Sequence, residues 1–251
     1  MTLPIRLGHL PWTRYHRKVA GTLALCFAFE LADINSFAYV APAVHHALHL
    51  GLREISVGTA SGFLGMFAGG RVAERAGRKR ALRACVLWFS VCSLATAGAF
   101  DPISLLAARF LTGCGLGAMT VVAVTYLTEL IPGNQRGQVQ AGTLALGLRG
   151  IPAMAFFARA VIGLGPQSWR LVVVFGALGV VPLVITRWLP ESPAWQRVPE
   201  TPLRLFRGGF ARRTTMLAGV WIFLTTSYYG FASFAPALLH ERGFTVTHSV
   251  G

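Results

Sequence analysis

Acidic residues are scarce in this sequence of 251 residues. It holds nine Asp and Glu against 23 Lys and Arg, and only 13% of its residues are charged, whereas soluble domains carry about 25%. With 54% hydrophobic residues and a mean hydropathy of +0.56, the composition excludes an ordinary soluble domain and is typical of membrane proteins. The net charge of +14 does not indicate a nucleic-acid-binding protein, because apolar runs of membrane-spanning length separate the basic residues and no nucleic-acid-binding motif is present.

Cysteine is scarce as well. The four cysteines, Cys26, Cys85, Cys92 and Cys114, fall inside apolar runs, and none has the spacing of metal ligands. We expect them to be small buried apolar side chains. The sequence also lacks a nucleophile–base constellation and a phosphate-binding loop, so we expect neither an enzyme nor a cofactor. Residues 1–18 lack the apolar core and cleavage site of a signal peptide, which predicts that the first apolar run is an uncleaved insertion signal.

Long apolar runs, in contrast, are abundant. A membrane-spanning helix needs about 20 mostly apolar residues. Seven runs qualify, and the second is the weakest because it is rich in glycine. They predict an all-α polytopic membrane protein with spans at approximately Val19–Val44, Ile55–Ala73, Ala81–Phe100, Ile103–Ile131, Ala141–Leu164, Leu171–Leu189 and Thr215–Leu239.

The distribution of Lys and Arg predicts the orientation of these spans. If the loops alternate between the two sides, 17 of the 23 basic residues lie on the side of the N-terminus, three lie on the other side and three lie inside the runs. Cytoplasmic loops carry the excess of Lys and Arg. The sequence therefore predicts a cytoplasmic N-terminus and a location in the cell membrane.

Proline and charge mark the domain boundaries. Residues 1–18 are expected to be a cytoplasmic N-terminal segment, and residues 19–189 a bundle of six helices. Residues 190–213 contain four prolines followed by basic residues, which is typical of a cytoplasmic linker between domains. Residues 214–251 then supply only one further span.

Two carboxylic acids in the first run are candidate functional residues. Glu30 and Asp33 lie three residues apart and so share one face of a helix. Asp33 is near mid-span, where a charged carboxylate needs a cavity, a partner or a proton. It is a candidate proton-carrying residue, and a structural hydrogen bond to a neighbouring helix is the alternative. Phe37, one turn further, either lines the same cavity or packs in the core.

Two arginines are the corresponding basic candidates. Arg109 lies near the start of the fourth run, about 9 Å from its outer end, and either extends to the membrane surface or pairs with Asp33. Arg149 lies near the middle of the fifth run, where an arginine is a functional candidate by default. Because a guanidinium binds a carboxylate through two parallel hydrogen bonds, Arg149 favours an organic anion as substrate over a neutral sugar. An ion pair of Arg149 with Glu30 or Asp33 is the alternative.

Several motifs resemble one known family. The stretch Gly70-x-x-x-Glu74-Arg75-x-Gly77-Arg78-Lys79 resembles the loop between the second and third helices of major facilitator superfamily transporters, with Glu74 where that pattern usually has Asp. The run from Arg109 to Gly137, Trp169-Arg170, the segment 189–193 and the run from Tyr229 to Phe244 resemble the sugar-porter-like and organic (aromatic) acid:proton symporter branches.

The resemblance implies a role for these residues in secondary transport by alternating access. Asp33 and Arg109 correspond to the family's proton-coupling pair, and Glu30, Phe37 and Arg149 are expected to contact the substrate. A set of residues at the helix ends is expected to latch the cytoplasmic side: Gly70, Glu74, Arg75, Gly77, Arg78, Lys79, Glu129, Arg136 and Glu191. Solvation of an ordinary basic loop is the alternative for that set.

The expected partners are the lipid bilayer, a small organic anion and protons, with a sugar as the alternative substrate and no nucleic acid. The family has twelve helices in two halves, so residues 19–189 would form its N-terminal six-helix bundle and residues 214–251 the first helix of a C-terminal half. The alternative function is therefore a truncated, transport-incompetent protein, or a half-transporter that needs a complementary C-terminal half.

Overall fold

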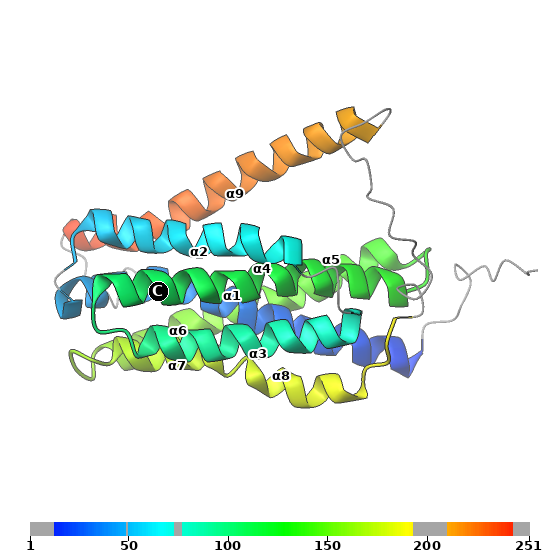
Figure 1. The fold of residues 1–251 in the computed structure, drawn as a ribbon, viewed down its shortest axis with the longest axis horizontal. Coiled ribbons are helices and arrows are strands. Elements are labelled where there is room, and N and C mark those ends of the chain that lie inside the picture. Colours follow the sequence, from blue (N-terminus) through cyan, green and yellow to red (C-terminus); the bar gives the residue numbers. More distant parts are fainter. Residues whose placement is uncertain (1–12, 49, 73–76, 193–209, 243–251) are drawn as a thin grey trace, which may run out of the picture.

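The computed structural model describes residues 13–48, 50–72, 77–192 and 210–242 (Figure 1). These residues form α-helices and one short 3-10 helix, η2. In chain order the elements are α1 (Arg14–Leu48), α2 (Leu52–Val72), α3 (Arg78–Ala97), α4 (Pro102–Leu130), α5 (Arg136–Gly147), α6 (Gly150–Ile162), α7 (Trp169–Ala177), α8 (Val180–Ile185), η2 (Thr186–Trp188) and α9 (Phe210–Glu241).

Helices occupy all seven predicted runs. Judged by length and composition, five helical segments within the described residues can cross a membrane: Arg14–Leu48, Arg78–Ala97, Pro102–Leu130, Arg136–Ile162 and Trp169–Trp188. The glycine-rich α2 and the long α9 occupy the second and seventh runs. Figure 1 shows α1 to α8 as a bundle of helices that lie side by side, with α9 diverging from it.

Two of the predicted spans are interrupted. The fifth breaks between α5 and α6 at Leu148 and Arg149, and the sixth between α7 and α8 at Leu178 and Gly179. A proline disrupts the helix around the residue four positions earlier, because its ring clashes with that carbonyl and it has no N–H to donate. Pro152 and Pro182 each stand four residues after a break, and i→i−3 hydrogen bonds such as Val181 N to Leu178 O (2.8 Å) replace the regular pattern there.

Helices α2 and α4 pack almost backbone to backbone. A Cβ added to Gly65 would lie 2.0 Å from Phe110 O, and one added to Gly113 would lie 2.0 Å from Gly62 O. Only glycine permits this approach, which membrane helices use to gain van der Waals contact. The glycines that make α2 the least apolar of the predicted spans thus fix its position against α4.

A buried polar layer separates two apolar clusters inside the bundle. One cluster, around Leu23, Phe89 and Tyr126, lies towards the N-terminal end of α3. The other, around Val40 and Trp169, lies towards the opposite end. Between them α1, α3 and α4 contribute buried polar side chains: Glu30, Asp33, Ser90, Ser93, Thr96, Arg109 and Thr112. The buried Asp, Glu and Arg side chains of the described residues, Glu30, Asp33 and Arg109, all belong to this layer.

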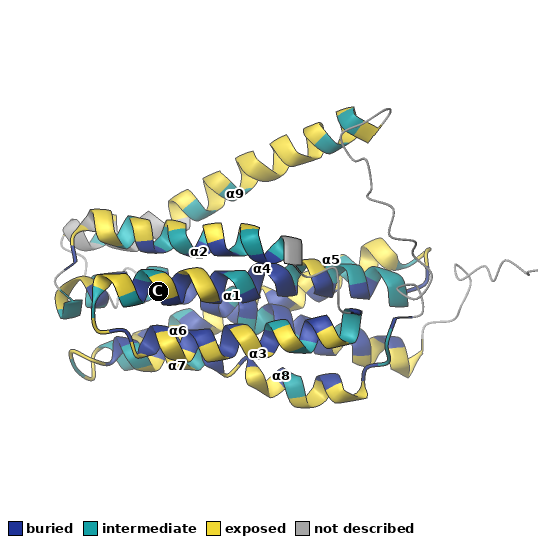
Figure 2. Cartoon of the chain, in the orientation of Figure 1, coloured by how far each residue is buried: buried dark blue, intermediate teal, exposed yellow. Residues whose placement is uncertain are grey.

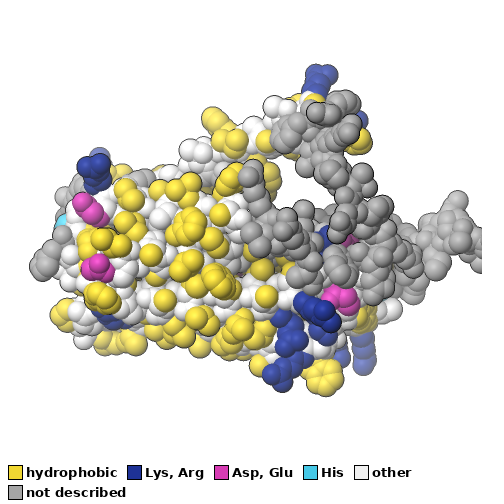
Figure 3. Space-filling model, in the orientation of Figure 1, with side chains coloured by type: hydrophobic (Ala, Val, Ile, Leu, Met, Phe, Trp, Pro, Cys, Tyr) yellow, Lys and Arg dark blue, Asp and Glu magenta, His cyan; other side chains and the backbone are white. Residues whose placement is uncertain are grey.

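The outer surface of the bundle is apolar. Figure 2 shows buried residues facing inwards and exposed ones facing outwards, and Figure 3 shows hydrophobic side chains over most of the visible face. Helix α9 is exposed along most of its described length, with Trp221 65%, Phe223 78% and Phe231 78% exposed. Such exposure of large apolar side chains requires a lipid environment or another protein surface.

Candidate functional site

The centre of the polar layer is the carboxylate of Asp33 on α1. Asp33 is fully buried, and its Oδ2 lies 3.8 Å from Arg109 Nη1. Its Oδ1 accepts a hydrogen bond of 2.6 Å from the hydroxyl of Ser93 on α3. On the α7 side, Gly176 leaves no room beyond the carboxylate, since a Cβ there would lie 2.2 Å from Asp33 Oδ1. Asp33 therefore contacts α3, α4 and α7 at once.

The ion pair between Asp33 and Arg109 is loose. At 3.8 Å the two charged atoms are beyond hydrogen-bonding distance. Asp33 Oδ2 and Arg109 Nε and Nη1 are shielded from solvent without a hydrogen-bond partner among the described residues. The guanidinium lies over the ring of Phe37, with 4.8 Å between the guanidinium carbon and the ring centroid. Buried charges without full hydrogen bonding are costly, so this arrangement can be stabilised by a proton, a water molecule or an anion.

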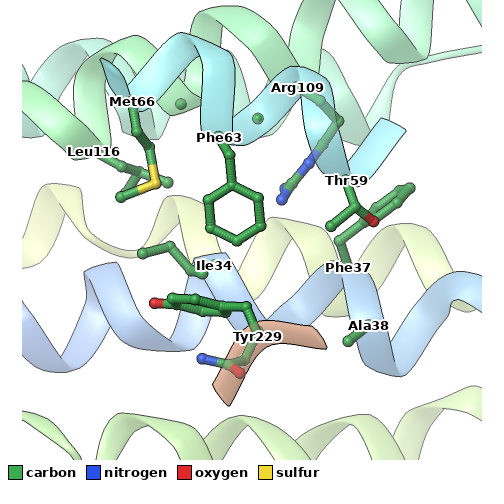
Figure 4. Close-up of a pocket in the computed structure, with 12 residues that line it drawn as sticks. Ile34, Phe37, Ala38, Thr59, Phe63, Met66, Arg109, Leu116 and Tyr229 are labelled. Atoms are coloured by element: carbon green, nitrogen blue, oxygen red, sulfur yellow. The ribbon is translucent and has the colours of Figure 1, made fainter. Parts of the chain in front are cut away.

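Arg109 and Phe37 line a small pocket between α1, α2 and α4 that Tyr229 of α9 covers (Figure 4). The aromatic ring of Phe63 on α2 meets that of Tyr229 edge to face, with 4.8 Å between their centroids. The pocket's cavity volume is about 20 Å³, which admits roughly one water molecule. In this state the pocket is too small for an organic substrate.

Glu30 is the second buried carboxylate of the layer. It lies one turn before Asp33, and its Oε1 accepts a hydrogen bond from the hydroxyl of Thr120 on α4. Its Oε2 is buried and has no hydrogen-bond partner in the described part of the chain. The structure thus brings Asp33, Phe37 and Arg109 into contact, whereas Glu30 lies one turn away on α1 and binds Thr120 instead.

Arg149 lies elsewhere. Its side chain is exposed and lines an apolar groove of about 390 Å³ with Ala28, Phe29 and Phe175. Ala28 of this groove and Phe37 of the pocket are nine residues apart on α1, which is two and a half helical turns and therefore opposite faces. Arg149 and Phe37 therefore line different cavities in this state, and Glu30 lines neither of the two. The alternative, an ion pair of Arg149 with Glu30 or Asp33, is absent among the described residues.

Most of the expected latch residues meet at the N-terminal end of α3. Gly77 adopts a φ of +78°, which a residue with a side chain rarely adopts, and thereby starts α3 abruptly. Arg78 Nε then lies 3.1 Å from Glu129 Oε1 on α4, and Lys79 N donates to Glu191 Oε1 at 2.9 Å. We call Gly77, Arg78, Lys79, Glu129 and Glu191 the α3 end cluster. It joins α3 to α4 and to the segment that follows η2.

The remaining latch residues do not join this cluster. Arg136 Nε donates to the carbonyl of Ile131 in its own loop, at 3.1 Å. A Cβ at Gly70 would meet Val121 at 3.6 Å, an ordinary contact, so Gly70 is a packing position. Glu74 and Arg75 lie outside the described residues.

Sequence reasoning missed the neutral partners of the charged groups. Ser93 and Thr120 donate hydrogen bonds to Asp33 and Glu30, Gly176 closes the wall behind Asp33, and Tyr126 donates to the carbonyl of Pro190 beside the α3 end cluster. A signal for Ser93 was available, because Ser90, Ser93 and Thr96 recur at helical spacing in an otherwise apolar run.

Comparison with known proteins identifies the family. The family model described as Major Facilitator Superfamily matches residues 23–251. The chain is 36% identical to the putative metabolite transport protein YyaJ of Bacillus subtilis, over 98% of this chain and 66% of the relative. It is 33% identical to the 3-(3-hydroxy-phenyl)propionate transporter of Escherichia coli, over 92% and 59%, and 27% identical to the niacin transporter NiaP of Acinetobacter baylyi, over 99% and 65%.

Solved structures agree on the fold. The crystal structure of a D-xylose-proton symporter superposes with a TM-score of 0.73 at 14% identity, covering 94% of this chain and 64% of that chain. A bacterial homolog of the human lysosomal transporter Spinster, inward-facing and occupied, gives a TM-score of 0.73 at 22% identity, over 96% and 57%. The chain spans 59–66% of the length of the three curated relatives above. The prediction of an all-α polytopic fold is confirmed, and the chain is a multi-pass membrane protein that belongs to the Major Facilitator Superfamily, a family of secondary transporters rather than enzymes.

Proposed function

We propose that this chain carries the proton-coupling half of a secondary transporter that takes up a small organic anion with protons. The loose pair of Asp33 and Arg109 is the observation that carries the proposal. A carboxylate that is fully buried, held by Ser93, and 3.8 Å from a guanidinium can exchange its charge for a proton without losing all of its contacts. Protonation of Asp33 frees Arg109, and the equilibrium between two access states then shifts.

Arg109 is the better candidate than Arg149 for the anion contact. Arg109 lines the pocket, and its Nε and Nη1 atoms have no hydrogen-bond acceptor among the described residues. A substrate carboxylate would supply two acceptor oxygens to the guanidinium. The rings of Phe37, Phe63 and Tyr229 offer apolar walls beside it. Two of the relatives are named for 3-(3-hydroxy-phenyl)propionate and niacin, which both carry a carboxylate on or near an aromatic ring. We therefore propose an aromatic carboxylate as the substrate class.

The closed pocket requires that substrate binding be coupled to a movement. Its volume of about 20 Å³ is far below the roughly 300–1,000 Å³ of small-molecule sites, so Tyr229 and α9 must move away from α1 and α2. The α3 end cluster closes the basic end of the bundle through the contacts of Arg78 with Glu129 and of Lys79 with Glu191. We propose that the contact of Lys79 with Glu191 breaks when that end opens, whereas the pair of Arg78 and Glu129 keeps α3 joined to α4. We further propose that the basic end faces the cytoplasm and that the chain resides in the cell membrane.

Uptake of a labelled aromatic carboxylate into proteoliposomes tests the coupling role. With an inward proton gradient, Asp33→Asn is expected to abolish the response to the gradient, because the amide cannot carry the proton. Arg149→Gln is the matched control, since it removes a charge at similar depth on the opposite face of α1. Equal gradient-driven uptake by Asp33→Asn and wild type would refute the role of Asp33.

Binding is measured separately from transport, because the alternative is a chain that needs a complementary C-terminal half. The thermal stability of the purified chain is compared with benzoate-type acids, aliphatic acids and sugars. Stabilisation by aromatic acids that Arg109→Gln removes and Arg149→Gln preserves supports the proposed site. Stabilisation by sugars alone would overturn the substrate class, whereas binding without uptake would favour the half-transporter.

A further inference from the structure

Four basic side chains form a patch beside the α3 end cluster. Lys79, Arg80 and Arg83 belong to the first turns of α3, and Arg187 belongs to η2 at the end of the sixth span. Lys79 Nζ donates to the carbonyl of Arg187 at 3.0 Å, which holds the two elements together. Figure 3 shows Lys and Arg side chains gathered at this end of the bundle. We call these four residues the basic patch.

No member of the patch forms an ion pair in the described part of the chain. Glu129 pairs with Arg78, and Glu191, which lies beside the patch, accepts hydrogen bonds from the backbone amides of Lys79 and Ser192 and not from a patch side chain. The described residues contain only two ion pairs, and neither includes a member of the patch. Arg83 Nε is shielded from solvent and has no hydrogen-bond partner among the described residues. A buried donor of this kind calls for an acceptor oxygen from outside the described chain.

An exposed apolar stripe continues from the patch along α3. Leu87, Val91 and Leu94 follow Arg83 at helical spacing and are 48%, 55% and 51% exposed. On the neighbouring span, Val184 is 59% exposed, and Trp188 at the patch itself is 88% exposed. Tryptophan is enriched where the membrane meets water. The surface is thus cationic at the membrane boundary and apolar from there inwards.

We propose that the basic patch binds the phosphate of an anionic phospholipid, whose acyl chains lie along the stripe of Leu87 and Val91. A free phosphate would satisfy the cations but would leave the apolar stripe without a role. A phospholipid matches both the basic patch and the apolar stripe, because the two follow one another along one face of α3. Clusters of Lys and Arg at the end of a membrane helix attract anionic lipids by about 1 kcal/mol per residue, a factor of roughly five in affinity. Bound lipid also bridges α3 and η2, so it is expected to stabilise the protein against thermal unfolding.

The test titrates the purified 251-residue chain in detergent with phosphatidylglycerol or with phosphatidylcholine of the same acyl chains. Native mass spectrometry counts bound lipid, and thermal unfolding reports stabilisation. Wild type is expected to retain phosphatidylglycerol selectively. The triple variant Arg80→Gln, Arg83→Gln and Arg187→Gln is expected to bind it roughly 100-fold more weakly. The control variant Arg53→Gln, Arg159→Gln and Arg213→Gln removes the same charge from exposed positions elsewhere and is expected to stay within about threefold of wild type.

Replacement of the same three patch arginines by lysine keeps the charge and is expected to preserve most of the affinity, which separates lipid binding from folding. Equal loss in the patch and control variants would overturn the proposal, as would equal binding of phosphatidylcholine. Full competition by glycerol phosphate would assign the patch to a free anion instead of a lipid. None of these readouts depends on transport, so the outcome is independent of the function proposed above.

Discussion

Replacing Gly176 by alanine places a methyl group against the carboxylate of Asp33. The new Cβ would lie 2.2 Å from Asp33 Oδ1 and 3.3 Å from Asp33 Cβ, whereas non-bonded heavy atoms prefer about 3.5 Å. The carboxylate cannot turn aside freely, because Ser93 holds the same oxygen at 2.6 Å. Either the hydrogen bond breaks or α7 moves away from α1, and such overpacking costs about 1–3 kcal/mol.

Gly142→Ala is the matched control, because nothing lies within 4 Å of a Cβ added there in α5. Both substitutions gain about 0.5–1 kcal/mol from the helix preference of alanine, so the difference between them isolates the collision. Thermal unfolding of the purified chain in detergent measures it. Gly176→Ala is expected to unfold at a lower temperature than Gly142→Ala, by about 2–4 °C for each kcal/mol.

A second background tests whether Asp33 is the group that collides. In Asp33→Ala the oxygens are gone and only the contact at 3.3 Å remains, so the cost of Gly176→Ala is expected to fall by about 1 kcal/mol or more. If Gly176→Ala unfolds at the same temperature as Gly142→Ala, or costs the same in both backgrounds, then α7 does not confine Asp33 as described.

Three further predictions concern the two ends of the bundle. The half-buried ion pair of Arg78 and Glu129 is expected to give a coupling of about 1 kcal/mol in a double-mutant cycle, and this coupling should shrink in 1 M salt; a value of zero at low salt would contradict the latch. At the other end, hydrogen bonds from the first turn of α4 lower the pKa of Asp101 below its ordinary 3.8, so the stabilisation it gives is present above that pH and is lost as the pH falls further. Wild type is therefore expected to lose thermal stability below about pH 4 relative to Asp101→Asn, which caps the helix without titrating, and parallel curves would refute this. Finally, Phe100→Cys and Arg80→Cys are compared in a chain without its native cysteines. A membrane-impermeant maleimide is expected to label Phe100→Cys on intact cells and Arg80→Cys only after lysis. Labelling of both on intact cells would refute the proposed orientation.

The spans were predictable because each depends on a local property, a run of apolar residues of sufficient length. The helix breaks at Leu148 and Leu178 also have a local cause, because Pro152 and Pro182 each lie four residues later. They were not predicted, since each apolar run is long enough to be read as one continuous helix. The position of Arg149 was not predictable in this way. Its depth in the span follows from the sequence, whereas the face of α1 that it meets depends on how α5 and α6 pack against α1.

The residues of the candidate site also differ in whether the sequence alone predicts them. Asp33 and Arg109 were identifiable because a charge inside an apolar run demands a partner. The sequence gives no comparable signal for Ser93, Thr120 and Gly176. A lone hydroxyl in a helix can hydrogen-bond to the backbone of its own helix, and glycine is common in membrane helices. Their importance arises only from register between helices, which brings Ser93 to 2.6 Å from Asp33.

The geometry also limits how a proton at Asp33 can influence the basic end. Ser93 and Arg78 lie on α3, 15 residues apart, which is about 22 Å along the helix axis and too far for direct contact. Both the polar layer and the α3 end cluster, however, bridge α3 and α4: Asp33 contacts Ser93 and Arg109, and Arg78 contacts Glu129.

Under the proposed coupling, α3 and α4 therefore move as one rigid pair against α1. Protonation of Asp33 loosens its contacts with both helices at once, and the pair of Arg78 and Glu129 keeps the two helices joined. What must break at the basic end is then the contact of Lys79 with Glu191, which ties this pair to the sixth span. Glu191→Gln is accordingly expected to favour opening of the basic end more than Glu129→Gln does, as measured by the labelling rate of Leu189→Cys, a position that is buried in this state. The reverse order would refute movement of α3 and α4 as one body.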